Sequence, residues 1–251
     1  MAGRYVALGS SFAAGPWVGR RSSGSPRRAG RSASNYAALF AARAGLSLRD
    51  VTFSGATAAE LLDGQDGAGP PQIEAVKADT DLVTLTCGGN DVGYIGRLMV
   101  GSLVWPLSSL PRARREAAET DAQTSERLAA LPATFDRLLT AVRQRAPHAR
   151  IVLVDYLTIL PPDPSTSTGR LPASVASWAR DVASQLSAET RAAAARHDCG
   201  FVAASEASRD RHAWSASPWT RRYGLWPRDG APFHPNQAGM RAVADLLEAA
   251  I

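Results

Sequence analysis

The sequence is poor in cysteine and histidine and has no long apolar run, and each of these scarcities excludes a class of protein. Its 251 residues include two cysteines and four histidines. Two cysteines provide no disulfide framework, and the scattered cysteines and histidines lack the spacing of zinc ligands. No apolar stretch long enough for a signal peptide or a membrane span precedes the first strand-like segment. We therefore expect a cytoplasmic protein that needs no metal or cofactor and does not insert stably into a membrane; a secreted protein would require a leader that had already been removed.

Lysine is nearly absent too, since Lys77 is the only lysine among 28 basic residues. The formal net charge is +5 at pH 7, and a basic protein can bind nucleic acid through such a charge. No nucleic-acid recognition motif accompanies the arginines, so we expect no nucleic-acid partner. With 45% hydrophobic and 20% charged residues, the composition is that of an ordinary globular protein. The length favours a single domain over residues 1–251, and nothing in the sequence indicates its oligomeric state.

Short, β-rich apolar runs alternate with longer segments of helical periodicity. The predicted strands are Tyr5–Leu8, Leu48–Phe53, Leu82–Thr86, Ile151–Tyr156 and Phe201–Ala204. The clearest predicted helices are Asn35–Ala44, Ala133–Arg145, Ala173–Arg196 and Asn236–Ala250. This alternation predicts an α/β fold whose parallel sheet is covered by helices on both faces. In such a sheet the ligand crevice lies at the carboxyl ends of the strands, so the residues after each strand are where chemistry is expected.

Two segments interrupt the alternation. Trp17–Ser34 is rich in Arg, Ser and Gly and predicts an exposed loop. Its basic run either contacts an acidic surface or is simply solvated, and we favour the solvated loop. Tyr94–Leu131 contains an apolar piece with Trp105 and then a charged helix, which is long for a connection. Such excursions are often lids or substrate walls, so we predict one at about residues 94–131, although a plain packing helix explains the apolar residues equally well.

Serine, glycine and asparagine follow the first three predicted strands in turn. Ser11 comes after the first strand among small residues, open to substrate and at a helix start, where backbone N–H groups favour a developing anion. Gly55 follows the second strand and permits a close approach to the backbone while leaving its N–H free. Asn90 follows two glycines after the third strand and offers a carboxamide donor. Taken singly, each is also explained by an ordinary cap or turn.

A histidine comes immediately before the last predicted helix. His234 lies between Phe233 and Pro235, and a histidine held in this way is well placed to act as a general base. The other three histidines lie in polar, arginine-rich contexts that are typical of a protein surface.

Together and in this order, these blocks resemble the SGNH (GDSL-like) hydrolase family. The most specific parts of the resemblance are Gly88–Asp91 and His234–Met240, and it extends over almost the whole chain. It implies a flavodoxin-like three-layer α/β/α sandwich with a five-stranded parallel sheet in the order 2-1-3-4-5. It also implies a nucleophilic serine, an oxyanion-hole glycine and asparagine, and a catalytic histidine, which in this sequence are Ser11, Gly55, Asn90 and His234.

The sequence departs from the family pattern at two catalytic positions. The family's first block usually reads Gly-Asp-Ser, whereas here Ser10 stands in the aspartate position, and the register favours Ser11 over Ser10 as the nucleophile. The family normally places an aspartate three residues before the histidine, and that residue is Ala231 here. Some members use the backbone carbonyl at that position instead, so we favour support of His234 by the carbonyl of Ala231. Asp229, five residues before the histidine, is the alternative.

The resemblance implies a serine esterase or lipase whose partner is a small-molecule ester or lipid. In that mechanism His234 takes the proton of Ser11, the serine Oγ attacks the ester carbonyl, and an acyl-enzyme forms. The N–H groups of Ser11 and Gly55 and the side chain of Asn90 hold the oxyanion. An acyltransferase using the same acyl-enzyme is an alternative that the sequence does not separate from a hydrolase. A non-catalytic flavodoxin-like binding module is a further one, against which the four intact residues argue.

Overall fold

The computed structural model describes residues 2–67, 69–103, 107–111, 120–224 and 229–251. Its centre is one parallel sheet in the order β2-β1-β3-β4-β5. The strands are β1 (Arg4–Gly9), β2 (Ser47–Asp50), β3 (Leu82–Thr86), β4 (Arg150–Val154) and β5 (Gly200–Val202). The predicted fold class and strand order are confirmed.

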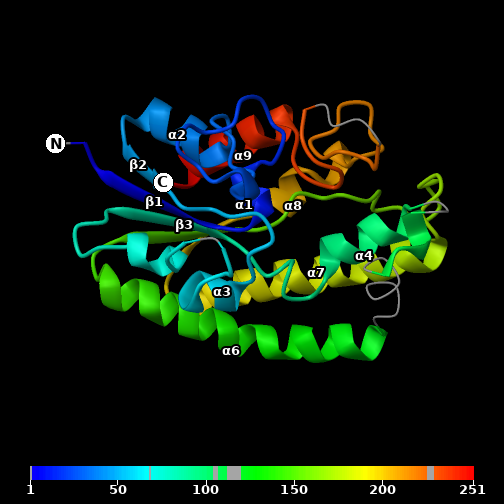
Figure 1. Ribbon diagram of the computed structural model, residues 1–251, viewed down its shortest axis with the longest axis horizontal. Coiled ribbons are helices and arrows are strands. Elements are labelled where there is room, and N and C mark those ends of the chain that lie inside the picture. The colour runs from blue at the N-terminus through cyan, green and yellow to red at the C-terminus, as the bar shows by residue number, and fades with distance from the viewer. Residues whose placement is uncertain (1, 68, 104–106, 112–119, 225–228) are drawn as a thin grey trace.

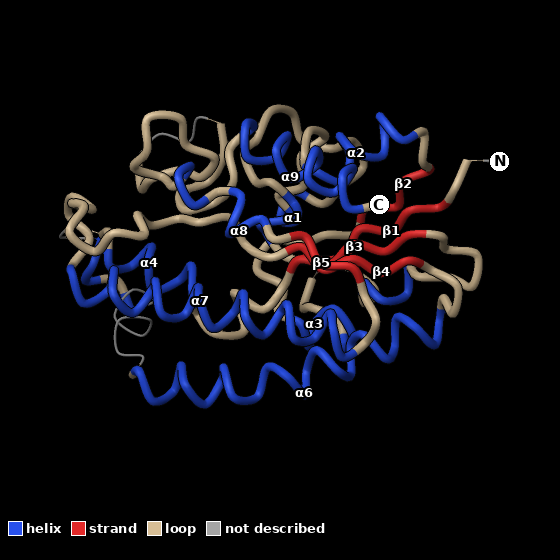
Figure 2. The backbone as a smooth tube through the Cα atoms, turned by 180° about the vertical axis from the view of Figure 1, so that it is seen from behind, coloured by secondary structure: helices blue, strands red, loops and turns tan. Residues whose placement is uncertain are grey.

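Helices cover both faces of this sheet. The α-helices are α1 (Ser11–Ala14), α2 (Tyr36–Ala44), α3 (Ala58–Asp63), α4 (Tyr94–Gly101), α6 (Asp121–Arg145), α7 (Ala173–Arg196), α8 (Ala204–Ala207) and α9 (Gln237–Ala250). Short 3₁₀ turns lie at Arg27–Ala29, Gln72–Ala75, Leu107–Ser109 and Arg209–Arg211. Figures 1 and 2 show α2 and α9 on one side of the sheet and α3, α6 and α7 on the other, which makes a three-layer sandwich.

The central strands are buried on both faces, as their near-continuous apolar sequences require. In β3 every residue is buried, and in β1 only Arg4 at the strand start is exposed. Two hydroxyl pairs satisfy polar side chains inside this core. Tyr5 pairs with Thr84 across 2.7 Å, and Tyr36 pairs with Thr86 across 3.0 Å. Buried hydroxyls that are paired in this way avoid the cost of an unmet hydrogen bond.

Side-chain caps explain small differences between the predicted and observed helix limits. Two helices that were predicted to begin at Asn35 and Asn236 begin one residue later in the structure. Each asparagine is the N-cap: the side chain of Asn35 accepts the N–H of Ala38, and that of Asn236 accepts the N–H of Gly239. The helix predicted from Ala133 is longer and starts at Asp121. A capping box opens it, and it continues through Pro132 because it is packed against α3 and α7.

The second predicted strand extends further along the chain than β2 does. β2 ends at Asp50, yet the next residues still run beside β1. The N–H of Val51 donates to the carbonyl of Ala7 over 3.1 Å, and that of Phe53 donates to Gly9 over 3.0 Å. The extended chain therefore delivers Ser54 to the same edge of the sheet at which β1 ends.

Candidate active site

Ser11 and His234 meet at the carboxyl end of β1. The Oγ of Ser11 lies 2.7 Å from the Nε2 of His234, although the two residues are 223 positions apart. Ser11 is the first residue of α1, and His234 belongs to the loop that precedes α9. Both residues are largely buried, with 7% and 8% of their surface exposed. The structure thus brings together the two residues that the sequence singles out for proton transfer.

The turn between β1 and α1 sets the position of Ser11. Gly9 has a φ of 146°, and a Cβ there would lie 2.5 Å from the carbonyl oxygen of Thr86, so only glycine fits. The side chain of Gln72 holds this turn from both sides. Its Oε1 accepts the N–H of Gly9 over 2.9 Å, and its Nε2 donates to the carbonyl of the same glycine over 3.1 Å. Gln72 is a positioning residue that the sequence reasoning missed.

The carbonyl that holds the imidazole ring is that of Pro232, 2.8 Å from Nδ1 of His234. The prediction that Ala231 supplies it is wrong by one residue, because the Ala231 carbonyl instead accepts the backbone N–H of His234 over 3.1 Å. The reason is local: Phe233 has a φ of 59°, which turns the chain tightly just before the histidine. Asp229 is not beside the ring either, because its Oδ1 accepts the N–H of Gln237 at the start of α9 over 2.9 Å.

Burial keeps the ring of His234 neutral. Burial lowers the pKa of His234 to about 4, and the hydrogen bond to the Pro232 carbonyl opposes that shift. Because a carbonyl only accepts, the proton of the neutral ring resides on Nδ1. Nε2 then presents its lone pair to the hydroxyl of Ser11. This is the arrangement in which a histidine takes a proton from a serine nucleophile.

Gly55 and Asn90 line the same cavity as Ser11 and His234. Gly55 has a φ of 85°, a conformation that favours glycine. The backbone N–H groups of Ser11 and Gly55 have no acceptor within the described part of the chain. The carboxamide of Asn90 donates one N–H to the carbonyl of Ala56 over 2.9 Å, which orients the group and leaves its second N–H for a ligand. The predicted donors thus surround one space.

A buried tyrosine joins the first and third sequence blocks. The hydroxyl of Tyr156 accepts the N–H of Gly89 over 2.9 Å and lies 3.3 Å from the Oγ of Ser10. A Cβ on Gly89 would lie 2.8 Å from that hydroxyl, so the glycine is required there. In the position where the family usually has an aspartate, Ser10 therefore offers a hydroxyl group to Tyr156 instead of a carboxylate. Tyr156 is a second residue that the sequence reasoning missed, although it follows β4 at the strand edge where site residues were expected.

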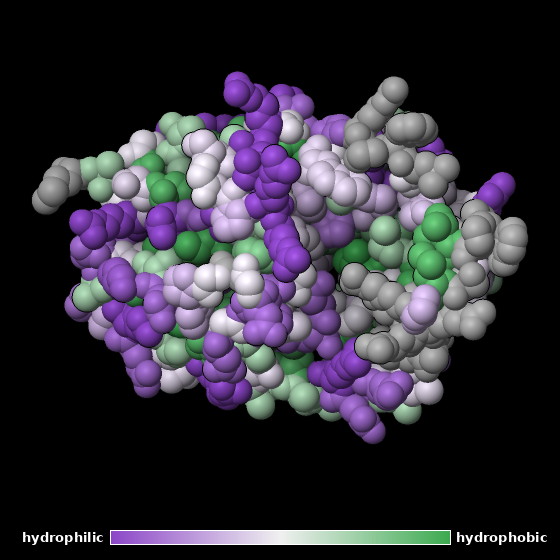
Figure 3. All heavy atoms as spheres, in the orientation of Figure 1, coloured by the Kyte–Doolittle hydropathy of each residue, from purple (hydrophilic) through white to green (hydrophobic). Residues whose placement is uncertain are grey.

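The cavity beside Ser11 has a volume of about 620 Å³ and walls of opposite character. Its apolar lining includes Ile95, Met99 and Val100 of α4 and, further along the chain, Leu103 and Leu110. Its remaining rim includes Trp17, Arg27 and Arg28. In the space-filling view a hollow opens on this face, with hydrophilic residues along one side and hydrophobic residues on the other (Figure 3). Trp105, which the sequence analysis placed in this wall, lies outside the described residues.

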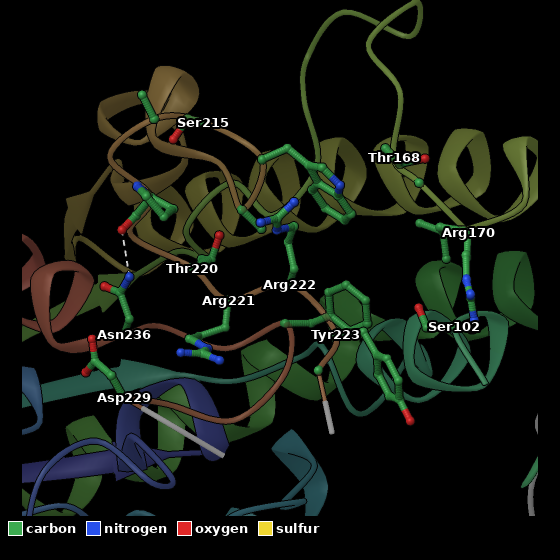
Figure 4. Close-up of a pocket in the computed structure, with 18 residues that line it drawn as sticks. Ser102, Thr168, Arg170, Ser215, Thr220, Arg221, Arg222, Tyr223, Asp229 and Asn236 are labelled. Carbon is green, nitrogen blue, oxygen red and sulfur yellow. Dashed lines mark hydrogen bonds between the residues drawn. The ribbon is translucent and has the colours of Figure 1, made fainter. Parts of the chain in front are cut away.

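A larger cavity of about 810 Å³ lies on the other side of the loop that carries His234. Figure 4 shows Arg221, Arg222 and Tyr223 along one stretch of chain, with Arg170 and Ser102 across from them. Its described lining has no histidine paired with a serine. The larger of the two cavities is therefore not the one that contains the predicted serine and histidine.

The described residues contain no group of histidine, cysteine, aspartate or glutamate side chains that could hold a metal ion. Cys87 is a buried free thiol and Cys199 a half-buried one. None of the helices in the described ranges has the length and apolar character needed to cross a membrane.

Comparison with known sequences gives whole-chain matches. The model of the GDSL-like Lipase/Acylhydrolase family matches residues 7–242. Lipase 2 of Streptomyces coelicolor is 33% identical over 251 residues, which cover 96% of this chain and 83% of that protein. A lipase of Streptomyces rimosus is 30% identical, with 94% of this chain and 81% of that protein covered.

Two solved structures have the same architecture along their whole length. The extracellular lipase of Streptomyces rimosus superimposes with a TM-score of 0.82 at 26% identity, and 100% of each chain is covered. Phospholipase A1 of Streptomyces albidoflavus gives a TM-score of 0.78 at 25% identity, again with 100% of both chains covered. The first of these overturns the expected cytoplasmic location, because a relative that matches the whole chain is an extracellular enzyme.

Proposed function

Because the chain belongs to the GDSL-like lipase/acylhydrolase family of serine ester hydrolases, we propose that Ser11 and His234 form the dyad with which it cleaves carboxylic esters. The observation that carries this proposal is the 2.7 Å contact between the serine Oγ and the histidine Nε2. The free N–H groups of Ser11 and Gly55 beside that contact support the same assignment, since an ester hydrolase needs donors for an oxyanion.

In the proposed reaction, Nε2 of His234 accepts the hydroxyl proton as the Ser11 Oγ bonds to the ester carbonyl carbon. The carbonyl oxygen becomes an oxyanion that accepts hydrogen bonds from the N–H groups of Ser11 and Gly55 and from the carboxamide of Asn90. The imidazolium then returns its proton to the alkoxide as the ester C–O bond breaks, and an alcohol leaves. Water, deprotonated by His234, attacks the acyl-enzyme and releases the acid in the same way.

In this proposal the backbone carbonyl of Pro232 orients the histidine ring, which is the role of the aspartate in a catalytic triad. It holds the Nδ1–H of His234 and so keeps the ring in the tautomer that the reaction needs. A neutral carbonyl stabilises the imidazolium less than a carboxylate does. We therefore propose a dyad rather than a triad.

Helix α4 and the residues after it form the wall for the acyl chain in this proposal. Its apolar side chains line the cavity beside Ser11, so an acyl group bound there would lie against hydrocarbon rather than water. The described parts of the predicted insertion that line the cavity, within residues 94–103 and 107–111, then belong to the single hydrolase domain as a substrate wall. The likeness to the extracellular Streptomyces rimosus lipase supports a secreted protein.

The test is covalent labelling by a fluorophosphonate, which phosphonylates an activated serine. The wild-type protein should be labelled, and mass spectrometry of the peptides should place the label on Ser11. Ser11→Ala should abolish labelling, whereas Ser10→Ala should retain it. A label on Ser10, or no label on a folded protein that hydrolyses no p-nitrophenyl ester, would contradict the proposal.

A further inference from the structure

The loop between α1 and α2 contains five arginines, and four of them form two pairs with different surroundings. Arg31 joins the loop to the end of β2, because its guanidinium donates to the carbonyl of Thr52 over 3.1 and 2.7 Å and pairs with the carboxylate of Asp50. Arg21 likewise donates to the carbonyl of Ser25. Arg27 and Arg28 are exposed and line the cavity that contains Ser11. Within the described ranges, neither has an acidic side chain paired with it.

The turn that carries Arg27 and Arg28 is fixed to the proposed oxyanion loop. The carbonyl of Ala29 accepts two hydrogen bonds from Ser54, from its N–H over 3.0 Å and from its Oγ over 2.9 Å. Gly55 is the next residue along the chain. The two arginines are therefore held beside a donor that the proposed function places at the reacting carbonyl.

The same loop is tied to the histidine loop at its other end. The carbonyls of Pro16 and Trp17 accept the N–H groups of Ala231 and Gly230 over 2.9 and 3.0 Å. Trp17 remains 57% exposed at the rim of the cavity. The arginine-bearing rim is thus connected by backbone hydrogen bonds to both sides of the Ser11–His234 pair.

The opposite character of the two walls indicates how an ester lies in this cavity. An acyl chain gains from burial against α4, and it gains nothing from a guanidinium. Two unpaired guanidinium groups favour an oxyanion, which they bind through their forked N–H donors. The fitting substrate therefore has a hydrocarbon acyl chain on one side of the ester and an anionic group on the other.

We propose that Arg27 and Arg28 bind a phosphate on the alcohol side of the scissile ester, so that the preferred substrates are anionic glycerophospholipids. This inference rests on the proposed function. In a glycerophospholipid the phosphate is attached to the same glycerol as the acyl esters, so one molecule occupies both walls while its ester lies at Ser11. A neutral glyceride has no anionic group for the arginines and would contact only the apolar wall.

The experiment compares two soluble esters that differ only in the phosphate: dihexanoyl phosphatidic acid and dihexanoylglycerol, both below their micellar concentrations. Monomeric substrates exclude adsorption to a charged lipid surface as the cause of any preference. The measured quantity is the ratio of kcat/KM for the anionic ester to that for the neutral one. Hydrolysis of p-nitrophenyl hexanoate is recorded in parallel as the readout of the proposed function itself.

The key variant is the double substitution Arg27→Gln, Arg28→Gln. Its matched control is Arg20→Gln, Arg49→Gln, which removes two exposed arginines that do not line the cavity. We expect the wild type to prefer the anionic ester. In the key variant the ratio of the two kcat/KM values should fall roughly tenfold, which is the scale of two charge-assisted contacts at a partly solvated rim. The control should keep the wild-type ratio, and added salt should reduce the preference of the wild type.

A charge-retaining variant, Arg27→Lys, Arg28→Lys, keeps the test informative if the glutamine variant does not fold, and it should keep most of the preference. The inference is overturned if the wild type shows no preference on monomers, or if the control loses the ratio equally. It is also overturned if the arginines matter only on vesicles, which would make them a surface attractant. Absence of p-nitrophenyl hexanoate hydrolysis would instead refute the proposed function.

Discussion

The cleft beside Ser11 and the larger cavity across the histidine loop are neighbours with different origins. The smaller cleft is lined by residues that follow β1, β2 and β3 and by His234 from near the end of the chain. The larger cavity is lined mostly by two loops, residues 168–171 and 213–224 (Figure 4). The carboxyl ends of parallel strands converge, so of these two cavities the first brings the proposed donors, nucleophile and base from separate elements to one point. The proposed active site is therefore distinguished from the larger cavity by this convergence of strand ends and not by its volume.

The loop that separates the two cavities presents alternate residues to them. Ala231 and His234 line the cleft, whereas Asp229 and Phe233 line the larger cavity. Phe233 has a φ of 59°, and this tight turn places adjacent side chains on opposite sides. A carboxylate and an imidazole that are close in the sequence are therefore separated in the structure.

The largest expected effect contrasts one serine from each cavity. Ser11→Ala removes the proposed nucleophile and should lower kcat for p-nitrophenyl hexanoate by about 10⁴ or more. Ser215→Ala is the matched control in the larger cavity, where the Oγ of Ser215 is buried and has no hydrogen-bond partner among the described residues. Loss of that hydroxyl should leave kcat within about twofold of wild type. Comparable losses in both variants, with unchanged circular dichroism, would break the distinction between the cavities.

A smaller loss is expected from the carboxamide in the cleft. Asn90→Ala removes one proposed oxyanion donor and should lower kcat by roughly 10²–10³ with little change in KM. The side chain also donates to the carbonyl of Ala56, so thermal melting of the variant should be measured as a control. An unchanged kcat in a stable variant would reduce Asn90 to a turn residue.

The pH profile tests the burial of His234. Only the neutral ring accepts the serine proton, and burial lowers its pKa to about 4. We therefore expect kcat/KM to be independent of this group above that pH and to fall about tenfold for each pH unit below it. In the unfolded chain the ring titrates near its ordinary pKa of about 6.5, so the protein also loses stability as the pH falls below that value. Circular dichroism at each pH separates the two effects, and a kinetic midpoint near 6.5 would mean that the ring is solvated.

The smallest effect is expected at the carboxylate on the far side of the histidine loop. Asp229→Asn should change kcat/KM only a few-fold, because this side chain contacts the start of α9 and lines the larger cavity. Loss of a true triad aspartate typically costs about 10⁴ in kcat. A loss of three decades or more would make Asp229 catalytic and would refute the assignment of Pro232.

The sequence by itself predicted the α/β fold class, and its resemblance to the SGNH family implied the strand order and the candidate site residues. Apolar runs alternating with helical segments are sufficient for a parallel sheet, and the residues after its strands must then lie at one edge. Ser11, Gly55 and Asn90 were candidates because each follows a strand, and the family resemblance supplied their expected roles. His234 was identifiable from its block before the last helix.

Only the tertiary structure decided which groups support those residues. The carbonyl beside His234 depends on the φ of Phe233, which a neighbouring alanine and proline do not reveal. The contacts of Gln72 with Gly9 and of Tyr156 with Gly89 join residues more than 60 positions apart. In the sequence, the arginines of the loop between α1 and α2 form a single basic run. In the structure, Arg21 and Arg31 donate to backbone carbonyls, whereas Arg27 and Arg28 line the cleft. Such assignments depend on distances between remote elements, and those distances exist only in the packed molecule.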